Sequence, residues 1–385
     1  MSFVFISPHF PPNLEQFITA LRAREVNVLG IGDAPYHVLD SGLRKALVEY
    51  YYAPDMNQYE VMYRAVAHLA AKHSRIERIE SMNEYWLEVE ARLRRDFNVP
   101  GPTPADLERS RRKLGMKEVF RQHGIPCADG ERVTDAKRIE AFVARVGYPV
   151  IFKPDIGVGA DRTFVVSKFD ELKPHLENPP RGFLMEEFVK GELVSFDGLT
   201  DENGEILFST SMTVNAGIME IVQQQLEMFY YYRRGIPAAL EALGHKTVKA
   251  FDVRNRFFHT EFLKQGEHEY TALEINVRPP GGYSIDLMNY QCDFNLYQTY
   301  ADLVAGEKPS LDTERKYCVA HAARRHGHNY RHSHDELLHC LGDKLVAHMA
   351  MPDVFSAAMG NYGYVIRDAD ENALRASIAM VQEVV

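Results

Sequence analysis

Short apolar runs alternate with amphipathic stretches along the first quarter of the chain. Residues 3–6 and 26–29 have the character of short buried strands. The apolar spacing predicts helices at 14–24, 58–72 and 84–97. Strands that alternate with helices are typical of a parallel sheet, so we expect an α/β unit here. The proline- and glycine-rich stretch 100–104 then interrupts the pattern and marks a domain boundary.

Beyond this boundary the pattern switches between helices and short strands. We expect helices at 106–123, 136–146 and 371–383, and strands at 150–153, 164–166, 183–189, 195–199, 206–209, 317–323 and 362–366. Helices are also expected to fill 218–243, with the aromatic segment 228–234 packed among them. The alternative for this aromatic segment is a role in lining an acceptor pocket.

The clearest alternation of polar and apolar residues lies in a predicted hairpin at 257–277. Successive strand residues point to opposite faces. The apolar face is expected to carry Phe258, Phe262, Leu273, Ile275 and Val277. The polar face is expected to carry His259, Glu261, Glu274, Asn276 and, just beyond the strand, Arg278. A turn centred near 267–268 places Glu261 directly opposite Glu274.

The opposed carboxylates of this hairpin repel each other, so a cation between them is a natural partner. Carboxylate and amide oxygens are the ligands that Mg²⁺ prefers. Arg278 follows at once, and its guanidinium suits a phosphoryl group or a substrate carboxylate. The sequence therefore favours a magnesium and anion site, and the exposed polar face of an ordinary hairpin is the alternative.

A lysine followed by a glycine turn forms a second candidate. Lys153 ends a predicted strand, and Gly157 and Gly159 come shortly after it. Backbone N–H groups of such a turn can wrap phosphates. A plain glycine hairpin beside an exposed lysine is the alternative, because two glycines are a weak signal. The chain has neither a GxxxxGK[ST] loop nor a GxGxxG fingerprint, which disfavours a P-loop enzyme and a Rossmann dehydrogenase.

The composition of the chain limits the kinds of molecule that it is expected to bind. The chain has 385 residues with 44 Lys and Arg against 54 Asp and Glu, for a net charge of −10. A nucleic-acid partner is not expected, because neutralising phosphates requires a basic surface. No apolar run approaches ~18 residues, so no membrane partner is expected. The four cysteines form no CxxC pair, and we expect a cytoplasmic protein with reduced thiols.

The C-terminal region is rich in histidine. Six histidines lie between 321 and 339, but their spacing matches no standard zinc pattern, so a loop and a helix face are favoured over a zinc site. The chain also lacks a GxSxG elbow, and its cysteines have no evident catalytic partner. The sequence thus offers cations and metal ligands but no catalytic nucleophile, and no general base can be assigned.

Taken in order, the motifs closely resemble those of the ATP-grasp superfamily. They are Lys113, Gly124-Ile125-Pro126, Gly147 to Pro154 with the glycine loop, Met185 to Glu192, Phe258 to Phe262 and Leu273 to Gly282. Within the superfamily, residues 105–305 are similar to the carboxylate–amine ligases. The resemblance implies an α/β and α+β architecture. A Rossmann-like pre-ATP-grasp domain would span 1–103, two α+β subdomains that clamp ATP would span 104–190 and 191–310, and a small α+β subdomain would span 311–385.

The resemblance also implies a role for each motif residue. The nucleotide side would comprise Lys113 and Lys153 for the phosphates, Gly157 and Gly159 for the loop that closes over them, Glu186 or Glu187 with the backbone through Val189 for adenine, and Glu192 for ribose. The metal side would comprise Glu261, Glu274 and Asn276, which would bind Mg²⁺, with Mn²⁺ as an alternative ion. Arg278 would stabilise the transferring phosphoryl group or the acyl phosphate, and Lys153 would act with it in catalysis.

Two positions depart from the pattern of the superfamily. Arg112 stands where an acidic residue usually precedes the helix lysine, which makes Lys117 a competitor for the role of Lys113. Glu192 directly follows Gly191, whereas many relatives have one residue between them, so the ribose contact is open to another residue.

The activity implied by the resemblance is ATP-dependent formation of an amide bond. A small carboxylate, such as an amino acid, would be phosphorylated to an acyl phosphate and passed to an amine, with release of ADP and phosphate. The oligomeric state stays open, although a homodimer is common among such enzymes. The alternatives are an ATP-dependent carboxylase or thiol ligase on the same fold, and a regulatory ATP-binding protein without catalysis.

Overall fold

The structure is a computed structural model that describes residues 1–157 and 162–385. The N-terminal part contains a parallel sheet in the order β3-β2-β1-β4. Its strands are β1 (Ser2–Ile6), β2 (Asn27–Gly32), β3 (Glu49–Tyr52) and β4 (Arg78–Glu80). The predicted N-terminal α/β unit is therefore confirmed.

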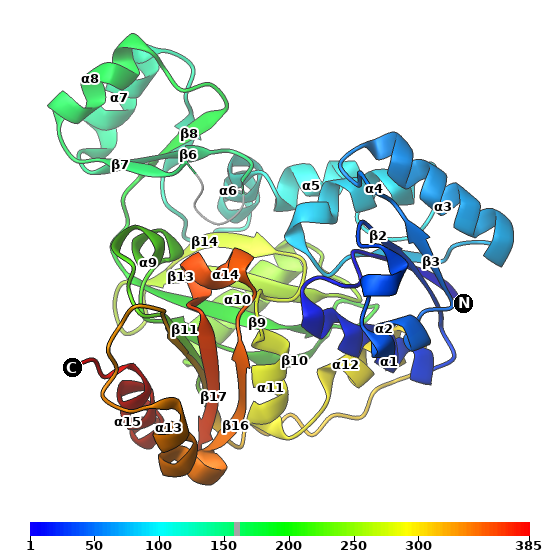
Figure 1. Ribbon diagram of the computed structural model, residues 1–385. Helices are drawn as coiled ribbons and strands as arrows, with labels where there is room; N and C mark the ends of the chain where they lie inside the picture. The colour runs from blue at the N-terminus through cyan, green and yellow to red at the C-terminus, as the bar shows by residue number, and fades with distance from the viewer. Residues whose placement is uncertain (158–161) are drawn as a thin grey trace.

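Helices cover both faces of this sheet because its strands are apolar on both sides. Phe5 of β1 belongs to one core with α1 (Glu15–Ala23), and its neighbour Val4 belongs to another with α3 (Tyr59–His73). The layers are completed by α2 (Ser41–Ala46), the short helix η3 (Glu84–Trp86) and α4 (Leu87–Asp96). This N-terminal unit is blue in Figure 1.

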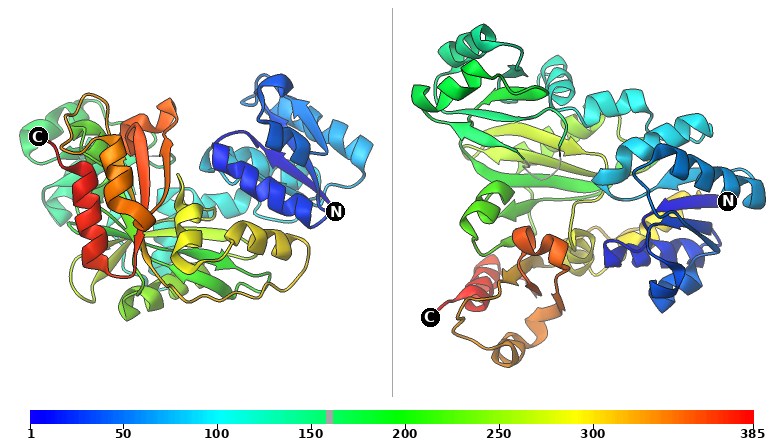
Figure 2. Two further views of the ribbon diagram at one scale, coloured as in Figure 1. Left: turned by 60° about the horizontal axis from the view of Figure 1, so that its bottom comes forward. Right: turned by 45° about the horizontal axis from the view of Figure 1, so that its top comes forward.

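A second unit carries the predicted lysine strand. Its antiparallel sheet has the order β5-β8-β6-β7. The strands are β5 (Gly130–Arg132), β6 (Val150–Pro154), β7 (Phe164–Val166) and β8 (Phe183–Glu187), and the packed helices are α7 (Ala136–Val146) and α8 (Phe169–Glu177). Figure 1 and Figure 2 show this nucleotide-side unit projecting from the rest of the molecule.

A larger sheet runs from the predicted hairpin to the C-terminal region, in the order β14-β13-β9-β11-β12-β15-β17-β16, with β10 paired to β9. Its strands are β9 (Glu192–Thr200), β10 (Ile206–Thr210), β11 (Met212–Val214), β12 (Phe229–Tyr232), β13 (Phe257–Lys264), β14 (Tyr270–Asn276), β15 (Cys318–Arg324), β16 (Leu345–Ala350) and β17 (Tyr362–Asp368). Pairing of β12 with β15 joins the C-terminal strands to the hairpin in one sheet, and the four-part domain division stays a prediction.

Helices pack beside this sheet. They are α9 (Ile218–Gln224), α10 (Ala238–Ala250), α11 (Ser284–Cys292), α12 (Leu296–Val304), α13 (His334–Leu341), α14 (Asp353–Met359) and α15 (Glu371–Gln382). In the described ranges of the chain, every helix is too short or too polar to span a lipid bilayer.

Two segments differ from the sequence prediction. The helix expected at 106–123 is divided into α5 (Pro104–Ser110) and α6 (Lys113–Gln122), which places Lys113 at a helix start. The helices expected across 218–243 are interrupted by β12, so the interpretation of 228–234 as part of a packed helix is wrong. The tyrosines of β12 are buried on both faces of the sheet, and such a strand lacks the polar alternation that separates strands from helices.

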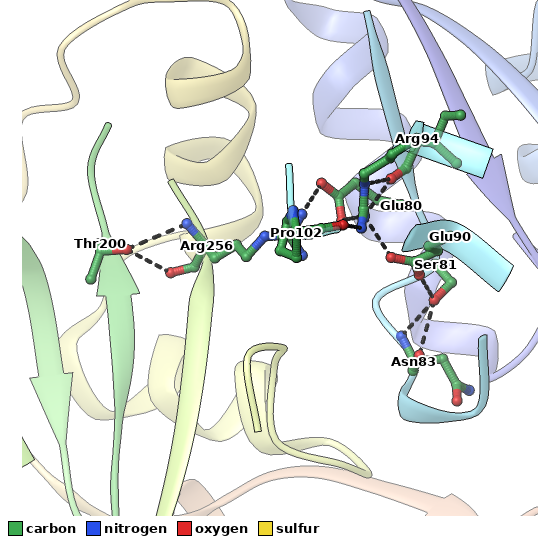
Figure 3. A network of polar contacts seen from close by, with 9 residues as sticks. Glu80, Ser81, Asn83, Glu90, Arg94, Pro102, Thr200 and Arg256 are labelled. Atoms are coloured by element: carbon green, nitrogen blue, oxygen red, sulfur yellow. Dashed lines mark hydrogen bonds and ion pairs between the residues drawn. The ribbon is translucent and has the colours of Figure 1, made fainter. Parts of the chain in front are cut away.

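Buried ion pairs join the N-terminal unit to the larger sheet. Arg94 of α4 contacts Glu80 at 2.8 Å and Glu90 at 2.6 Å, and Arg256, just before β13, contacts Glu80 at 2.5 Å. Figure 3 shows Arg256 extending from beside Thr200 on the sheet toward this group. All four charged residues are at most 9% exposed. We call them the Glu80–Arg256 cluster, which ties β4 to β13.

Candidate active site

The hairpin of β13 and β14 brings the predicted metal residues together. Glu261 lies opposite Glu274, and His259 lies opposite Asn276, as the sequence predicts. The side chain of Glu261 is partly exposed, so this polar face is open to a ligand. The geometric part of the prediction is therefore confirmed, whereas metal binding by these residues stays a prediction.

A β-bulge changes the apolar face of the same hairpin. The register shifts after Glu261, so that Phe262 pairs with Ala272. Leu273 becomes the extra residue of the bulge and is half-buried, while Ala272 and Tyr270 join the buried cluster. The expected place of Leu273 on the apolar face is therefore wrong, because strict alternation does not foresee a bulge.

Polar neighbours hold the two carboxylates. Asn276 Nδ2 donates to Glu274 Oε1 at 3.0 Å. His259 Nε2 lies 3.3 Å from Glu261 Oε1, and its Nδ1 lies 2.6 Å from Asp197 Oδ1. Burial alone would lower the pKa of His259, but the two carboxylates outweigh burial and raise it to about 10. His259 is thus a buried cation that positions Glu261, and its contact with Asp197 was missed because β9 and β13 are far apart in sequence.

The donor set of the hairpin fits Mg²⁺. Two carboxylates and an amide supply hard oxygen ligands, which suit magnesium better than a soft metal. Within the described residues, the hairpin included, no group of three or more His, Cys, Asp or Glu side chains is arranged to hold a metal ion by itself. Phosphate oxygens would have to complete the coordination of a magnesium ion at the hairpin. The same finding gives the zinc alternative for the histidine-rich segment no support.

Glu186 gathers two lysines in the nucleotide-side unit. The ammonium groups of Lys153 and Lys117 both contact its carboxylate, and all three residues are buried. Burial alone would raise the pKa of Glu186, but the two ammonium groups outweigh it and lower the pKa. Lys117 also donates to Ala128 O at 2.8 Å. The ammonium group of Lys117 is therefore bound in the protein interior, and Lys113 is the better candidate for contact with a ligand.

Asp155 supplies the acid that is missing before Lys113. Its Oδ1 accepts from Leu114 N at 3.1 Å, and its backbone O accepts from Lys113 N at 3.0 Å, which caps the start of α6. Its Oδ2 also contacts Arg112 at 3.2 Å and Arg132 at 3.3 Å. Sequence reasoning missed this residue because the cap comes from the exit of β6 rather than from the residue before the helix.

Gly157, which follows β6, lies beside Lys113, whose Nζ is 3.4 Å from Gly157 O. Among the described residues, a Cβ at Gly157 would meet only Pro154, at 3.6 Å, so packing against them does not require glycine there. Glycine at a position with free space allows close approach of the backbone to a ligand. Gly159 lies outside the described residues.

The predicted adenine hinge is the connection between β8 and β9. Glu187 Oε1 accepts from Asp129 N at 2.7 Å, which fixes the end of β8. Val189 is half-buried in the connection, and Glu192 is exposed at the start of β9, opposite Lys264. The structure thus places these residues in one segment, and their contacts with adenine and ribose stay predictions.

A cavity of about 520 Å³ joins the two halves of the candidate site. Its lining includes Lys113 and Gly157 from the nucleotide side and Glu274 and Asn276 from the hairpin. Lys113 and Glu274 are of opposite charge, so the cavity offers a polyphosphate a cation together with oxygen ligands for a metal ion.

Arg278 lies at the edge of this site. Its Nη1 donates to Pro279 O at 2.8 Å, and its guanidinium also contacts the carboxylate of Glu84 in η3. The N-terminal unit therefore reaches the residue that follows the hairpin. This contact could not be predicted from the sequence, because Glu84 lies in a helix pattern far from Arg278 in the chain.

A lysine-bearing α+β unit shares a cavity with a hairpin of opposed carboxylates in the larger sheet. The chain has the ATP-grasp fold, which its solved structural neighbours share. No family model matches the chain. The L-arginine-specific L-amino acid ligase of Bacillus subtilis is 24% identical over 229 residues, which cover 57% of this chain and 55% of that ligase. The chain spans about half the length of the curated relatives it matches.

Solved structures extend the similarity over the whole chain. The L-amino acid ligase from Bacillus licheniformis has a TM-score of 0.74 at 14% identity and covers 100% of this chain and 98% of its own. The biotin carboxylase domain of the Hydrogenobacter thermophilus 2-oxoglutarate carboxylase, solved with MgADP and bicarbonate, has a TM-score of 0.69 at 15% identity and covers 99% of this chain and 90% of its own. At these identities the likeness establishes the fold.

Proposed function

We propose that the protein is an ATP-dependent carboxylate–amine ligase that acts on small molecules, with amino acids as the expected substrates. The observation that carries the proposal is the shared cavity, because residues suited to phosphates and residues suited to a divalent ion line it together. The relatives named as amino acid ligases support the same chemistry. The free thiols of all four cysteines fit a cytoplasmic location, and a homodimer stays a prediction.

The proposed reaction has two steps. A carboxylate oxygen of the acid attacks the γ-phosphorus of ATP in line, and ADP leaves, which forms an acyl phosphate. The neutral amine then attacks the acyl carbon, the bond from that carbon to the phosphate oxygen breaks, and inorganic phosphate leaves while the nitrogen gives up one proton to solvent. Activation is needed because a free carboxylate has no leaving group for an amine to displace.

The chain's own residues would serve this reaction by holding charges in place. Lys113 and Lys153 would bind the phosphates, with the turn at Gly157 against them. Arg278 would neutralise charge that develops on the transferring phosphoryl group. Mg²⁺ would be held by Glu261, Glu274 and Asn276, and it would supply further charge neutralisation at the phosphates.

The test of this function is product formation from Mg-ATP and a panel of amino acids, supplied singly and in pairs. We expect ADP and phosphate release that depends on both an acid and an amine, with a condensed product in the mass spectrum. Glu274→Gln should abolish this turnover without unfolding the protein, whereas Glu267→Gln in the exposed hairpin turn should leave it unchanged. ATP turnover that persists in Glu274→Gln with normal magnesium dependence would contradict the metal assignment.

A further inference from the structure

The cavity beside Lys113 and Glu274 extends well beyond these two residues. It measures about 520 Å³, and part of its wall is formed by Arg78 of β4, by α5 and by residues 252–255 before β13. We call the part of the cavity at Arg78 and Arg109 its outer part, because Arg109 of α5 is exposed. The residues of the proposed ligase site leave this outer part without a role.

Most basic side chains in the wall of the cavity already have a counter-charge. Figure 3 shows Arg94 and Arg256 turned toward the carboxylate of Glu80, where they belong to the Glu80–Arg256 cluster. The other pairs, with the distance between their charged atoms, are Arg111 with Glu88 at 2.9 Å and Arg254 with Asp252 at 2.7 Å. These four guanidinium groups are therefore paired within the protein.

The acidic side chains of the cavity are occupied as well. Asp106 accepts from Thr103 N and Thr103 Oγ1 at 2.8 Å, which caps α5. Glu77 contacts the N-terminal ammonium group at 3.7 Å, and Glu84 contacts Arg278. Among the described residues, none of the acids that line the cavity forms an ion pair with a guanidinium group of the outer part.

Arg78 and Arg109 are the guanidinium groups that remain among the described lining residues. In this part of the chain neither forms an ion pair, and Arg109 Nη2 donates to Ala250 O at 3.4 Å. Arg78 is half-buried, where a cation without a counter-charge is costly. Both groups line one cavity, so their like charges disfavour each other until an anion enters. The planar fork of each guanidinium suits the oxygen atoms of such an anion.

We propose that Arg78 and Arg109 form a second anion site, which binds the inorganic phosphate released by the ligase reaction. The proposal rests on the ligase function proposed above and extends it to product release. In that reaction phosphate is set free beside Lys113 and Glu274, in the same cavity. Lys113 and Arg109 are four residues apart, so their Cα atoms are at most about 14 Å apart. A phosphate ion in the outer part is thus separated from the new amide and cannot attack it in the reverse reaction.

The experiment titrates inorganic phosphate into the protein in the presence of Mg²⁺ and AMP-PNP, an ATP analogue whose γ-phosphoryl group occupies the position beside Lys113. Binding is followed by the line width of the ³¹P signal of phosphate. We expect phosphate to bind with the analogue present, and Arg109→Gln and Arg78→Gln each to weaken this binding by about 10–100-fold, the range for a charged hydrogen bond. Because Arg109 is exposed, Arg109→Gln keeps the fold and decides the outcome if Arg78→Gln unfolds.

Arg254→Gln is the matched control, because Arg254 lines the same cavity but pairs with Asp252. It should bind phosphate as the wild type does. Equal phosphate affinity of the wild type and Arg109→Gln would overturn the proposal. Displacement of phosphate by acetate at a lower concentration than by sulfate would also overturn it, because the site would then select a carboxylate.

Turnover measurements separate this site from the ligase function. Phosphate should inhibit ADP release by the wild type even at saturating ATP, and Arg109→Gln should need at least about 10-fold more phosphate for the same inhibition. Equal inhibition of the two proteins would contradict a role in product release. If the wild type releases no ADP with any acid and amine, the ligase function fails instead. Phosphate titration of the protein alone then still decides on Arg109, and equal affinities would overturn its role.

Discussion

Single residues of the candidate site are held by buried opposite charges. Glu186 shows this most clearly, since it neutralises both Lys153 and Lys117 in an interior position. A polyphosphate would offer Lys153 a second anion without requiring Glu186 to move. The carboxylate thus holds the ammonium group of Lys153 in a fixed place.

Replacement of Glu186 by Gln tests this arrangement. The variant leaves two ammonium groups without their shared counter-charge, so we expect a loss of about 3–5 kcal/mol in the free energy of unfolding. Urea denaturation measures the loss. Glu187→Gln is the control, because its amide oxygen can still accept from Asp129 N, and it should lose less than about 1 kcal/mol. Equal stability of the two variants would contradict the account.

The residues that the sequence revealed are those that lie in continuous motifs. Glu261 and Glu274 were found because an alternating hairpin with a short turn fixes which residues face each other. Asp155 and Glu84 were missed because their partners come from other segments of the chain. Periodicity describes one element at a time, so it carries no information about which exposed acid of one element meets the base of another.

At the scale of elements, α6 depends on a cap from β6. Asp155→Ala should remove the side-chain half of the cap, while the backbone oxygen still accepts from Lys113 N, and loosen the helix start with a loss of about 1–2 kcal/mol in stability. Because Lys113 is displaced, we expect the KM for ATP to rise on the order of 10-fold or more. Asp135→Ala removes an equivalent cap from α7, where Asp135 Oδ1 accepts from Arg138 N at 2.9 Å.

The Asp135→Ala control separates the effect of the cap on the position of Lys113 from its effect on the stability of the protein. Asp135→Ala should lose a similar cap energy of about 1 kcal/mol and leave the KM for ATP unchanged, since α7 carries no candidate site residue. A normal KM in Asp155→Ala would show that the cap does not position Lys113.

Strand β15 carries a pH-sensitive residue. His321 is fully buried against Tyr230, with ring centroids 5.3 Å apart, and burial lowers its pKa to about 4. In the unfolded chain the pKa of histidine is about 6.5. The unfolded state therefore takes up a proton first, and stability falls as the pH drops from about 6.5 toward 4, by about 3 kcal/mol in total. Above pH ~7 the titration of His321 does not contribute to the pH dependence of the unfolding free energy.

His321→Gln removes this titration. Between pH 7 and pH 4.5, the unfolding free energy of the wild type should decrease by about 2–3 kcal/mol more than that of the variant. Denaturant melts at both pH values measure the difference. Parallel pH profiles of the two proteins would show that His321 is protonated without cost in the folded state.

Helices and strands whose apolar residues recur with a regular period were predictable from the sequence. Elements in which this period is interrupted were not. The strands and helices of the N-terminal unit follow the expected order. The bulge at Leu273 and the split between α5 and α6 depend on local backbone geometry that a side-chain pattern does not encode. Strand β12 was mistaken for a helix because both of its faces are buried.

At the scale of the whole molecule, the Glu80–Arg256 cluster connects the N-terminal unit to the strand that bears Glu261. Arg256→Met leaves Glu80 with one buried partner fewer, and we expect a loss of about 3–5 kcal/mol in stability. Arg254→Met is the control, since Arg254 is exposed and pairs only locally with Asp252. It should lose less than about 1 kcal/mol. Similar stability of the two variants would show that the buried cluster does not hold the units together.

The order of units agrees with the sequence prediction at this scale, because each unit has its own continuous pattern. The joining of the C-terminal strands to the hairpin sheet was not predictable in the same way, since β12 and β15 are separated by two strands and several helices along the chain. Contacts between units, including Glu84 with Arg278, were likewise outside the reach of a pattern that lies within one unit.

Transfer of ¹⁸O from a labelled acid is the measurement that tests the proposed chemistry most directly. The substrate carboxylate is enriched in ¹⁸O and incubated with the enzyme, Mg-ATP and an amine, and the inorganic phosphate is analysed by mass spectrometry. If an acyl phosphate forms and is attacked at its acyl carbon, one labelled oxygen appears in phosphate and the other stays in the amide. Label in AMP, or turnover that leaves the phosphate unlabelled, would contradict the account.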